Sequence, residues 1–461
     1  MQQPDPLPRN IDGYVGDSLY PSSFHADFSP SSLDVMLLHA AIQPPRCGKQ
    51  SFTMVDIGCG DGLGLIAHAA SCPDAHFVGI DAMPGHIERG QRIIAELGLD
   101  NIELRCETFS DALSAAPIAA DYAAVQGVWS WISPQNQDAM LKLISHSLNP
   151  DGIAAIGYNC LPGWTPIASF QKLVGALAEG LTGSPTERFD QAVALTRAAS
   201  KAGMAVIGEE HFEWLAELQA QLPADYFAHE YLNGHWQPLW SGEAIATAAT
   251  HDLHFVGPAR PDRLRDDFAF KKAQREQLQA TINRGTREIM ADMFLNCWFR
   301  VDLYSRGPAE QCSETAVKSA RLDSFWIVNK PPSEAEYRTQ TAAGTIRFDN
   351  QSAQAILKRL DNGPASLRQI CDSGEAGTAA DILNVADALF IAKLITPVNP
   401  SAANSSATRF NQWLLDPVHK MPPINAIATQ HGPLSAPAGE IAARIGDINF
   451  RTRCGLDPDS R

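Results

Sequence analysis

Residues 55–64 read VDIGCGDGLG, a glycine-rich turn between a strand and a helix. The apolar run FTMVDI before the turn is typical of a buried strand, and LGLIAHAA after it has apolar residues at helical spacing. Glycine suits this turn because it adopts positive φ and lets a ligand approach the backbone. The free amides at the start of the helix would face that ligand. The stretch therefore predicts an α/β fold with a nucleotide-like ligand at the turn.

The spacing of these glycines argues against two common ligands. They stand at 58, 60, 62 and 64, whereas the dinucleotide fingerprint G-x-G-x-x-G requires a glycine where this chain has Leu63. No GK[ST] follows, so a phosphate-cradling loop is absent, and we expect neither NAD nor ATP. Asp56 would repel a pyrophosphate but suits a cationic or amino-bearing ligand. Asp81, which ends the next predicted strand, is placed to accept hydrogen bonds from ribose hydroxyls.

The motifs VDIGCGDG and GIDAM resemble motifs I and II of class I S-adenosylmethionine-dependent methyltransferases. Further stretches are similar to members that carry a methyltransferase regulatory domain, among them the rickettsial protein lysine methyltransferases: YPSSFH at 20–25, GVWSWISP at 127–134, GYNCLPGW at 157–164, HEYLNGHWQPLW at 229–240 and FRVDLYSRG at 299–307. The resemblance covers roughly residues 14–400. It implies S-adenosyl-L-methionine as cofactor and S-adenosyl-L-homocysteine as product. In the best-understood members, the acceptor is an outer-membrane protein.

The turn and the resemblance together give the expected cofactor-binding residues: Asp56, Gly58, Cys59, Gly60, Gly62, Asp81, Ala82, Glu107, Thr108, Phe109, Gln126 and Gly127. The family's third motif usually offers an acid near the adenine. Here that position falls on Thr108, with Glu107 before it and Asp111 after it, so each is a candidate for the adenine contact. Gln126 replaces a histidine expected before GVWSW, and the adenine contacts stay open.

The order of predicted elements gives the fold class. Strands at 52–57, 76–80, 101–106, 122–128 and 153–159 alternate with helices, which predicts a doubly wound, mostly parallel Rossmann-like sheet. LHFVG and FRVDLYS supply the sixth and seventh strands of a seven-stranded sheet. We expect three parts: a cofactor-binding domain at 14–165 completed by 242–306, a helical insertion at 166–330, and a winged-helix-like domain with a tail at 335–461. The insertion is expected to form a lid and substrate pocket, or else a side domain remote from the site.

Methyl transfer from a sulfonium is a direct displacement that requires alignment of the reacting atoms and exclusion of water. A lysine acceptor must also be neutral, and aromatic faces favour sulfonium and methylammonium cations. Aromatic and polar residues at the strand ends meet these needs. The expected catalytic residues are Trp129, Tyr158, Asn159, His229 and Glu230; the expected substrate-binding residues are Trp131, Trp164, Tyr231 and Trp236. The alternative is that the tryptophans are ordinary core and that His229 and Glu230 cap a loop. The histidine spacing predicts no metal site.

Composition narrows the partners. The 461 residues include 52 Asp and Glu against 36 Lys and Arg, and the net charge of -16 argues against nucleic-acid binding. Nine cysteines without a C-x-x-C pair favour reduced thiols. No signal pattern or membrane-length apolar run is present, so the expected location is cytoplasmic. The acceptor is expected to be a protein lysine. Two alternatives stay open: a small-molecule O- or N-methyltransferase of specialised metabolism, and a non-catalytic cofactor-binding regulator.

Overall fold

The computed structural model describes residues 10–11, 14–15, 20, 22, 24–46, 51–329, 338–399, 405–416, 426–427 and 434–435. At its centre lies a seven-stranded sheet in the order β5-β4-β3-β6-β7-β9-β8. The strands are β3 (Thr53–Ile57), β4 (His76–Asp81), β5 (Ile102–Cys106), β6 (Ala120–Gln126), β7 (Leu148–Asn159), β8 (Leu253–Pro258) and β9 (Phe299–Arg306). β9 runs antiparallel to both of its neighbours, and the pairs from β5 to β7 are parallel. The expected Rossmann-like sheet is confirmed, with its sixth and seventh strands where the sequence placed them.

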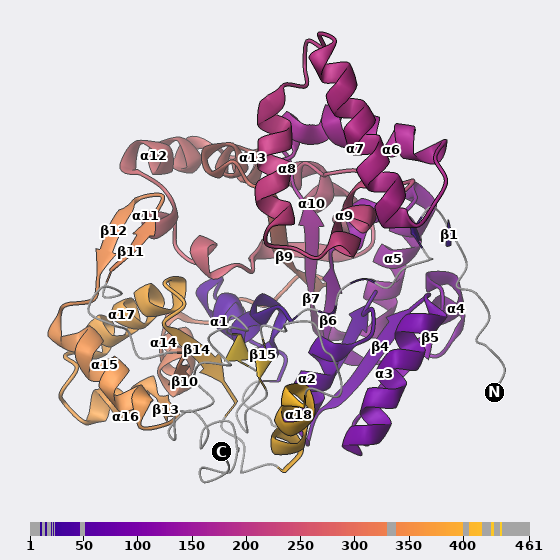
Figure 1. The fold of residues 1–461 in the computed structure, drawn as a ribbon. Helices are drawn as coiled ribbons and strands as arrows, with labels where there is room; N and C mark the ends of the chain where they lie inside the picture. Colours follow the sequence, from indigo (N-terminus) through magenta and orange to yellow (C-terminus); the bar gives the residue numbers. More distant parts are fainter. Residues whose placement is uncertain are drawn as a thin grey trace.

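Helices cover both faces of this sheet (Figure 1). One apolar core lies under α4 (Phe109–Ser114), α5 (Pro134–Ser147) and α10 (Ser241–Ala249). The other lies under α1 (Pro30–His39), α2 (Leu63–Ser71) and α3 (Pro84–Leu97). The sequence sets the helix ends: the Ser29 side chain accepts from the Ser32 amide at the start of α1, and Gly98 closes α3 in the left-handed region. The inner strands are buried on both faces, which explains their nearly continuous apolar runs.

The first insertion follows β7 and consists of α6 (Ala168–Glu179), α7 (Pro185–Lys201), α8 (Glu209–Gln219) and α9 (Ala224–Tyr231). These helices share their own apolar core and gather at one end of the sheet, in magenta in Figure 1. The chain returns through a bridge between Cys160 and Leu239, directly beyond the end of β7. Residues 229–231 were expected as a loop, but they form the last turn of α9. The sequence ADYFAHEY contains no helix breaker, and Pro223 precedes it.

The second insertion joins β8 to β9 through α11 (Asp266–Ala269), α12 (Lys272–Ala280) and α13 (Arg284–Leu295). The C-terminal unit then contains α14 (Glu314–Asp323), β10 (Phe325–Val328), the hairpin of β11 (Arg338–Thr341) and β12 (Gly344–Arg347), α15 (Gln351–Asp361), β13 (Ala365–Ser366), α16 (Leu367–Asp372), α17 (Ala379–Ile391) and β14 (Ile395–Val398). β10 pairs with both β13 and β14, and Trp326 is buried with them, so β10 packs with the C-terminal unit. The domain boundary near residue 330 stays a prediction. The winged-helix assignment of this unit stays a prediction.

Beyond this unit, α18 (Ser405–Leu415) packs on α2 and α3, where the sequence suggested a linker and irregular tail. Arg409 Nε donates to the Leu97 carbonyl at 3.0 Å, which holds the helix in place. Two further strand pairs are β1 (Asn10–Ile11) with β2 (Tyr14–Val15) and β15 (Ala426–Ile427) with β16 (Leu434–Ser435). The rest of the predicted tail lies outside the described residues. Within the described ranges, no helix has both the length and the apolarity needed to cross a bilayer.

Candidate active site

The glycine turn has one packed side and one open side. Gly58 and Gly60 have φ values of 79° and 58°, which side-chain-bearing residues rarely adopt. A Cβ on Gly58 would come within 2.4 Å of Val128 Cγ2, so that position packs against the loop after β6. A Cβ on Gly60 would meet no atom within 4 Å. The Gly58 amide fixes the turn by donating to the Ile80 carbonyl at 2.8 Å. The open side at Gly60 is therefore where a ligand can reach the backbone.

Carboxylates surround this turn. Asp81 accepts from the Gly60 amide at 2.9 Å and from the Met83 amide at 2.8 Å. Burial, and then the charge of Asp81, raise the pKa of Asp56 to about 7. Burial and the neighbouring carboxylates also raise the pKa of the Cys59 thiol, so it is no nucleophile. Such a site favours a ligand that carries positive charge, because a cation relieves the repulsion between the carboxylates.

The candidates for the adenine contact separate clearly. Thr108 begins α4, and its hydroxyl donates to Asp111 at 2.7 Å in a capping box, so both side chains are engaged with each other. Phe109 packs against the apolar core under α4. Glu107 directly follows β5, and its amide donates to the Asp81 carbonyl at the end of β4 at 3.1 Å. The Glu107 Oε2 atom is buried without a hydrogen-bond partner among the described residues. Glu107 is thus the carboxylate that is left available to a ligand amino group.

The remaining predicted cofactor residues lie on the same edge of the sheet. Gly62 begins α2, and Ala82 directly follows β4. Gln126 ends β6, and the Gly127 amide after it donates to the Gly157 carbonyl at 3.0 Å. The structure therefore brings the whole predicted set to the carboxyl ends of β3, β4, β5 and β6, where ligands bind in open α/β sheets.

His86 and Asp61, which are absent from the predicted set, bind the N-terminal segment to this edge. The Tyr20 amide donates to His86 Nε2 at 3.1 Å, and His86 Nδ1 lies 3.4 Å from Asp81 Oδ1. Because Nε2 accepts, Nδ1 carries the proton toward Asp81. Ser22 Oγ donates to Asp61 in the turn at 2.5 Å. The stretch YPSSFH pointed to the family, but its contact with β4 and the turn depends on pairs more than 35 positions apart.

The segment also contacts α9. The Tyr20 ring lies 5.3 Å from the His229 ring and 6.4 Å from the Tyr226 ring, measured between centroids. Glu230, next on α9, is 8% exposed, and burial raises its pKa to about 8 although the Tyr226 hydroxyl bonds to it. His229 and Glu230 are thus buried residues in the last turn of α9, a helix beside the cofactor edge.

Aromatic contacts connect the predicted substrate residues into a tryptophan chain, which we define as Trp131, Trp236, Trp164, Trp298 and Trp214. Successive ring centroids are 6.4, 5.3, 5.4 and 6.1 Å apart. The tryptophan chain begins at Trp131, in the 3-10 turn after β6 (Trp129–Trp131), and ends at Trp214 on α8. The Trp236 indole nitrogen is buried without a partner among the described residues. Sequence reasoning missed Trp298 and Trp214; Trp298 directly precedes the seventh strand, but α8 gave no such signal.

Other predicted residues lie outside this chain. The Tyr158 hydroxyl donates to Asp302 at 2.6 Å, and its ring packs edge-on against Trp129 in the sheet core. Neither ring is more than 2% exposed, so this burial does not support their predicted contact with a methyl acceptor. Tyr231 packs against Phe189, inside the core of the first insertion. Asn159 is better placed: it ends β7, and its Nδ2 is buried without a partner in the described part of the chain.

Two family models match the chain: "Methyltransferase domain" over residues 54–152 and "Predicted methyltransferase regulatory domain" over residues 223–306. The first spans the glycine turn and its carboxylates, and the second spans α9 and the last strands of the sheet. The chain contains a methyltransferase domain. Its regulatory domain shares the central sheet, because β8 and β9 complete that sheet.

Two relatives and one solved structure are similar to this chain. The methyltransferase is 25% identical over 361 residues to an uncharacterized protein of Synechocystis, covering 78% of this chain and 71% of that one. An uncharacterized protein of Rickettsia prowazekii is 33% identical over 144 residues, covering 31% and 56% of the two chains. The fold is similar to PKMT2 from Rickettsia typhi in complex with AdoHcy (S-adenosylhomocysteine). That similarity has a TM-score of 0.67 at 19% identity and covers 96% and 89% of the chains.

The residues at this edge fit the chemical groups of S-adenosylmethionine, the cofactor that the resemblance of the motifs implies. The ligand has a ribose, an adenine, a sulfonium and an amino acid, and no phosphate. Asp81 accepts from the amide of Gly60 on the open side of the turn, Glu107 offers an unpartnered carboxylate oxygen, and a cation beside Asp56 would favour its ionised form. These positions match ribose hydroxyls, an adenine amino group and positive charge in turn.

Proposed function

We propose that this methyltransferase transfers the methyl group to lysine side chains of a protein. The observation that carries the proposal is Glu230, a buried carboxyl with a pKa of about 8 on the helix that contacts the cofactor edge through Tyr20. A lysine ammonium must lose a proton before it can attack. A carboxylate whose pKa is raised toward that of an amine is a far better base for this proton than an ordinary glutamate.

In this mechanism the bound cofactor supplies an electrophilic methyl group on its sulfonium. The glycine turn, Asp81 and Glu107 hold the donor, while the tryptophan chain excludes water and guides the aliphatic stem of the acceptor. Glu230 takes the proton, and the Asn159 amide at the end of β7 orients the neutral amine. The aromatic faces also favour a partly methylated ammonium. The resemblance of the sequence motifs to rickettsial protein lysine methyltransferases supports the same acceptor.

A radiolabelled methyl-transfer assay on a cell extract tests this function. Label is expected in the protein fraction and, after hydrolysis, on methylated lysine. Glu230→Gln should lower kcat by about 10²–10⁴-fold while S-adenosylhomocysteine affinity stays unchanged, and Glu217→Gln on the exposed face of α8 is the matched control. Label found only in small molecules would support the small-molecule alternative. Intact cofactor binding without any transfer would support a non-catalytic regulator.

A further inference from the structure

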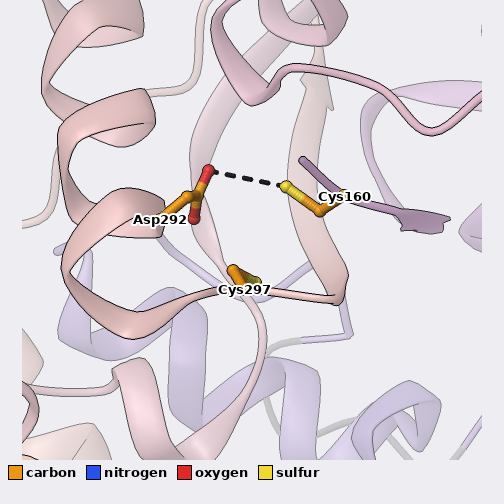
Figure 2. Close-up of side chains that lie close together, drawn as sticks. All are labelled: Cys160, Asp292 and Cys297. Atoms are coloured by element: carbon orange, nitrogen blue, oxygen red, sulfur yellow. Dashed lines mark hydrogen bonds between the residues drawn. The ribbon is translucent and has the colours of Figure 1, made fainter. Parts of the chain in front are cut away.

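Two cysteine sulfurs and a carboxylate oxygen meet beside the tryptophan chain (Figure 2). The ligand atoms of Cys160, Asp292 and Cys297 all lie within 4.8 Å of one another. Cys160 directly follows β7, and Cys297 lies between α13 and β9. The Cys160 amide donates to the Trp298 carbonyl at 2.8 Å, and the Gly163 amide donates to the Cys297 carbonyl at 3.0 Å. The backbone therefore clamps the two segments together on both sides of the thiols.

The two thiols differ in access. Cys160 is fully buried, whereas Cys297 is partly exposed and lines a cavity of about 490 Å³ together with Trp298 and Arg300. The Cys160 thiol donates to Asp292 Oδ2 at 3.6 Å, as the dashed line in Figure 2 shows, and the Cys297 thiol donates to the Phe299 carbonyl at 3.5 Å. The neighbouring Cys160 thiol lowers the pKa of Cys297, and the guanidiniums of Arg300 and Arg263 act in the same direction. A reagent in the cavity thus meets the more nucleophilic sulfur first, with a second sulfur directly behind it.

A metal ion is the alternative ligand for this cluster, but the carboxylate is already engaged. Asp292 Oδ1 accepts from Arg300 at 2.6 Å and from Arg263 at 3.3 Å, and Oδ2 accepts from Ser241 at 2.6 Å. A divalent cation would lie close to the two guanidinium charges. Among the described residues, the cluster offers no fourth ligand from His, Cys, Asp or Glu, whereas structural zinc sites use four.

We propose that Cys297 and Cys160 form a peroxide-sensitive thiol pair that closes to a disulfide. The Cys297 sulfur attacks a peroxide oxygen, the O–O bond breaks, and the released hydroxide takes up the Cys297 proton as water. The Cys160 sulfur then attacks the sulfur of the sulfenic acid at Cys297. The S–S bond forms, the S–O bond breaks, and the second hydroxide leaves as water with the Cys160 proton. In total, two thiols and one hydrogen peroxide give one disulfide and two waters.

Closure of this pair acts on the acceptor side of the enzyme. Asn159 precedes Cys160, and Trp298 follows Cys297 and forms part of the tryptophan chain. Drawing the sulfurs together shifts these neighbours, while Asp56 and Asp81 lie on other strands. The disulfide should therefore lower methyl transfer and leave cofactor affinity unchanged. This effect on turnover rests on the proposed function, but disulfide formation does not.

The test treats the reduced full-length protein with hydrogen peroxide and maps its peptides with and without a reductant. A peptide pair joined through Cys160 and Cys297 is expected, with the loss of two hydrogen atoms. In Cys160→Ser, Cys297 should accumulate as a sulfenic acid that dimedone traps. Cys297→Ser should form no bridge, and Cys312→Ser, at a partly exposed cysteine outside the cluster, should still form it.

Two results would overturn the proposal. One is oxidation of the exposed Cys106 while Cys160 and Cys297 both remain reduced. The other is one equivalent of zinc bound by the reduced protein and lost in both serine variants, which would assign the cluster to a metal. Because the peptide map of the unmodified protein reads the bridge directly, the test holds even if a serine variant fails to fold. A bridge that forms without changing turnover would contradict only the link to the acceptor side.

Discussion

Tyr20 and His86 are joined by a hydrogen bond of 3.1 Å from the Tyr20 amide to the Nε2 atom of the imidazole. The other imidazole nitrogen lies 3.4 Å from Asp81, and the Tyr20 ring lies 5.3 Å from that of His229. One residue of the N-terminal segment thus contacts both His86, beside Asp81, and the helix that carries Glu230. In the proposed mechanism, Tyr20 therefore connects the donor side with the acceptor side.

Replacing His86 by alanine should weaken S-adenosylhomocysteine binding by about 1 kcal/mol, or roughly fivefold, because Asp81 loses a hydrogen bond that orients it. Isothermal titration calorimetry measures this change. The control is His76→Ala, at the exposed start of β4, the strand that Asp81 ends. It should leave the affinity unchanged. Equal affinities for His86→Ala and the unmodified protein would show that the imidazole does not position Asp81.

Asp81→Ala should have a larger effect, about 1–3 kcal/mol, since it removes a charged acceptor of ribose hydroxyls and the anchor of the Gly60 amide. Asp100→Ala, on the exposed turn after α3, is the control. Calorimetry that finds unchanged affinity for the Asp81 variant would refute the assignment of this carboxylate to the cofactor.

The affinity for S-adenosylmethionine should fall as pH drops below about 7, the pKa of Asp56 in the free protein. The sulfonium favours the ionised carboxylate, so binding at lower pH must first release a proton, at a cost of up to about tenfold per pH unit. S-adenosylhomocysteine has no sulfonium and should show a weaker dependence. Asp56→Asn should remove the difference between the two ligands; if the difference persists, another group is responsible.

The same residue sets a stability test. The pKa of Asp56 lies above its ordinary value of 3.8, so the folded protein loses stability as pH rises from about 4 to 7 and the carboxylate ionises. Without ligand at pH 8, Asp56→Asn should therefore raise the melting temperature by several degrees. Thermal unfolding measured at pH 4 is the internal control, since the folded Asp56 carboxyl is then neutral and most of the destabilisation is absent. A lower melting temperature at pH 8 would contradict the raised pKa.

Trp236 stands in the middle of the tryptophan chain between Trp131 and Trp164. Trp236→Ala should lower kcat/KM for the acceptor roughly tenfold, equivalent to about 1.4 kcal/mol, while cofactor affinity stays unchanged. Trp413→Ala on α18 serves as the control, because Trp413 is not part of the tryptophan chain. If kcat/KM is unaffected, Trp236 is an ordinary packing residue.

The glycine turn, the strand alternation and the helix ends determined most of the central sheet from local patterns. The same patterns placed the cofactor residues, because parallel strands bring their carboxyl ends to one edge. Contacts between distant segments had no local signal: His86 with Tyr20, Trp298 with Trp164, and β10 with the C-terminal strands. Tyr158 shows the opposite failure, since its position at a strand end predicted access, but its side chain turns inward to Asp302.

The pH–rate profile of methyl transfer at saturating S-adenosylmethionine, compared between the unmodified enzyme and Glu230→Gln, tests the joint donor and acceptor site most directly. The rate of the unmodified enzyme should rise through about pH 8, as the Glu230 carboxyl ionises and becomes able to accept the lysine proton. In the variant, kcat should fall by about 10²–10⁴-fold, and the inflection near 8 should disappear. A variant that keeps both the rate and the inflection would contradict the account.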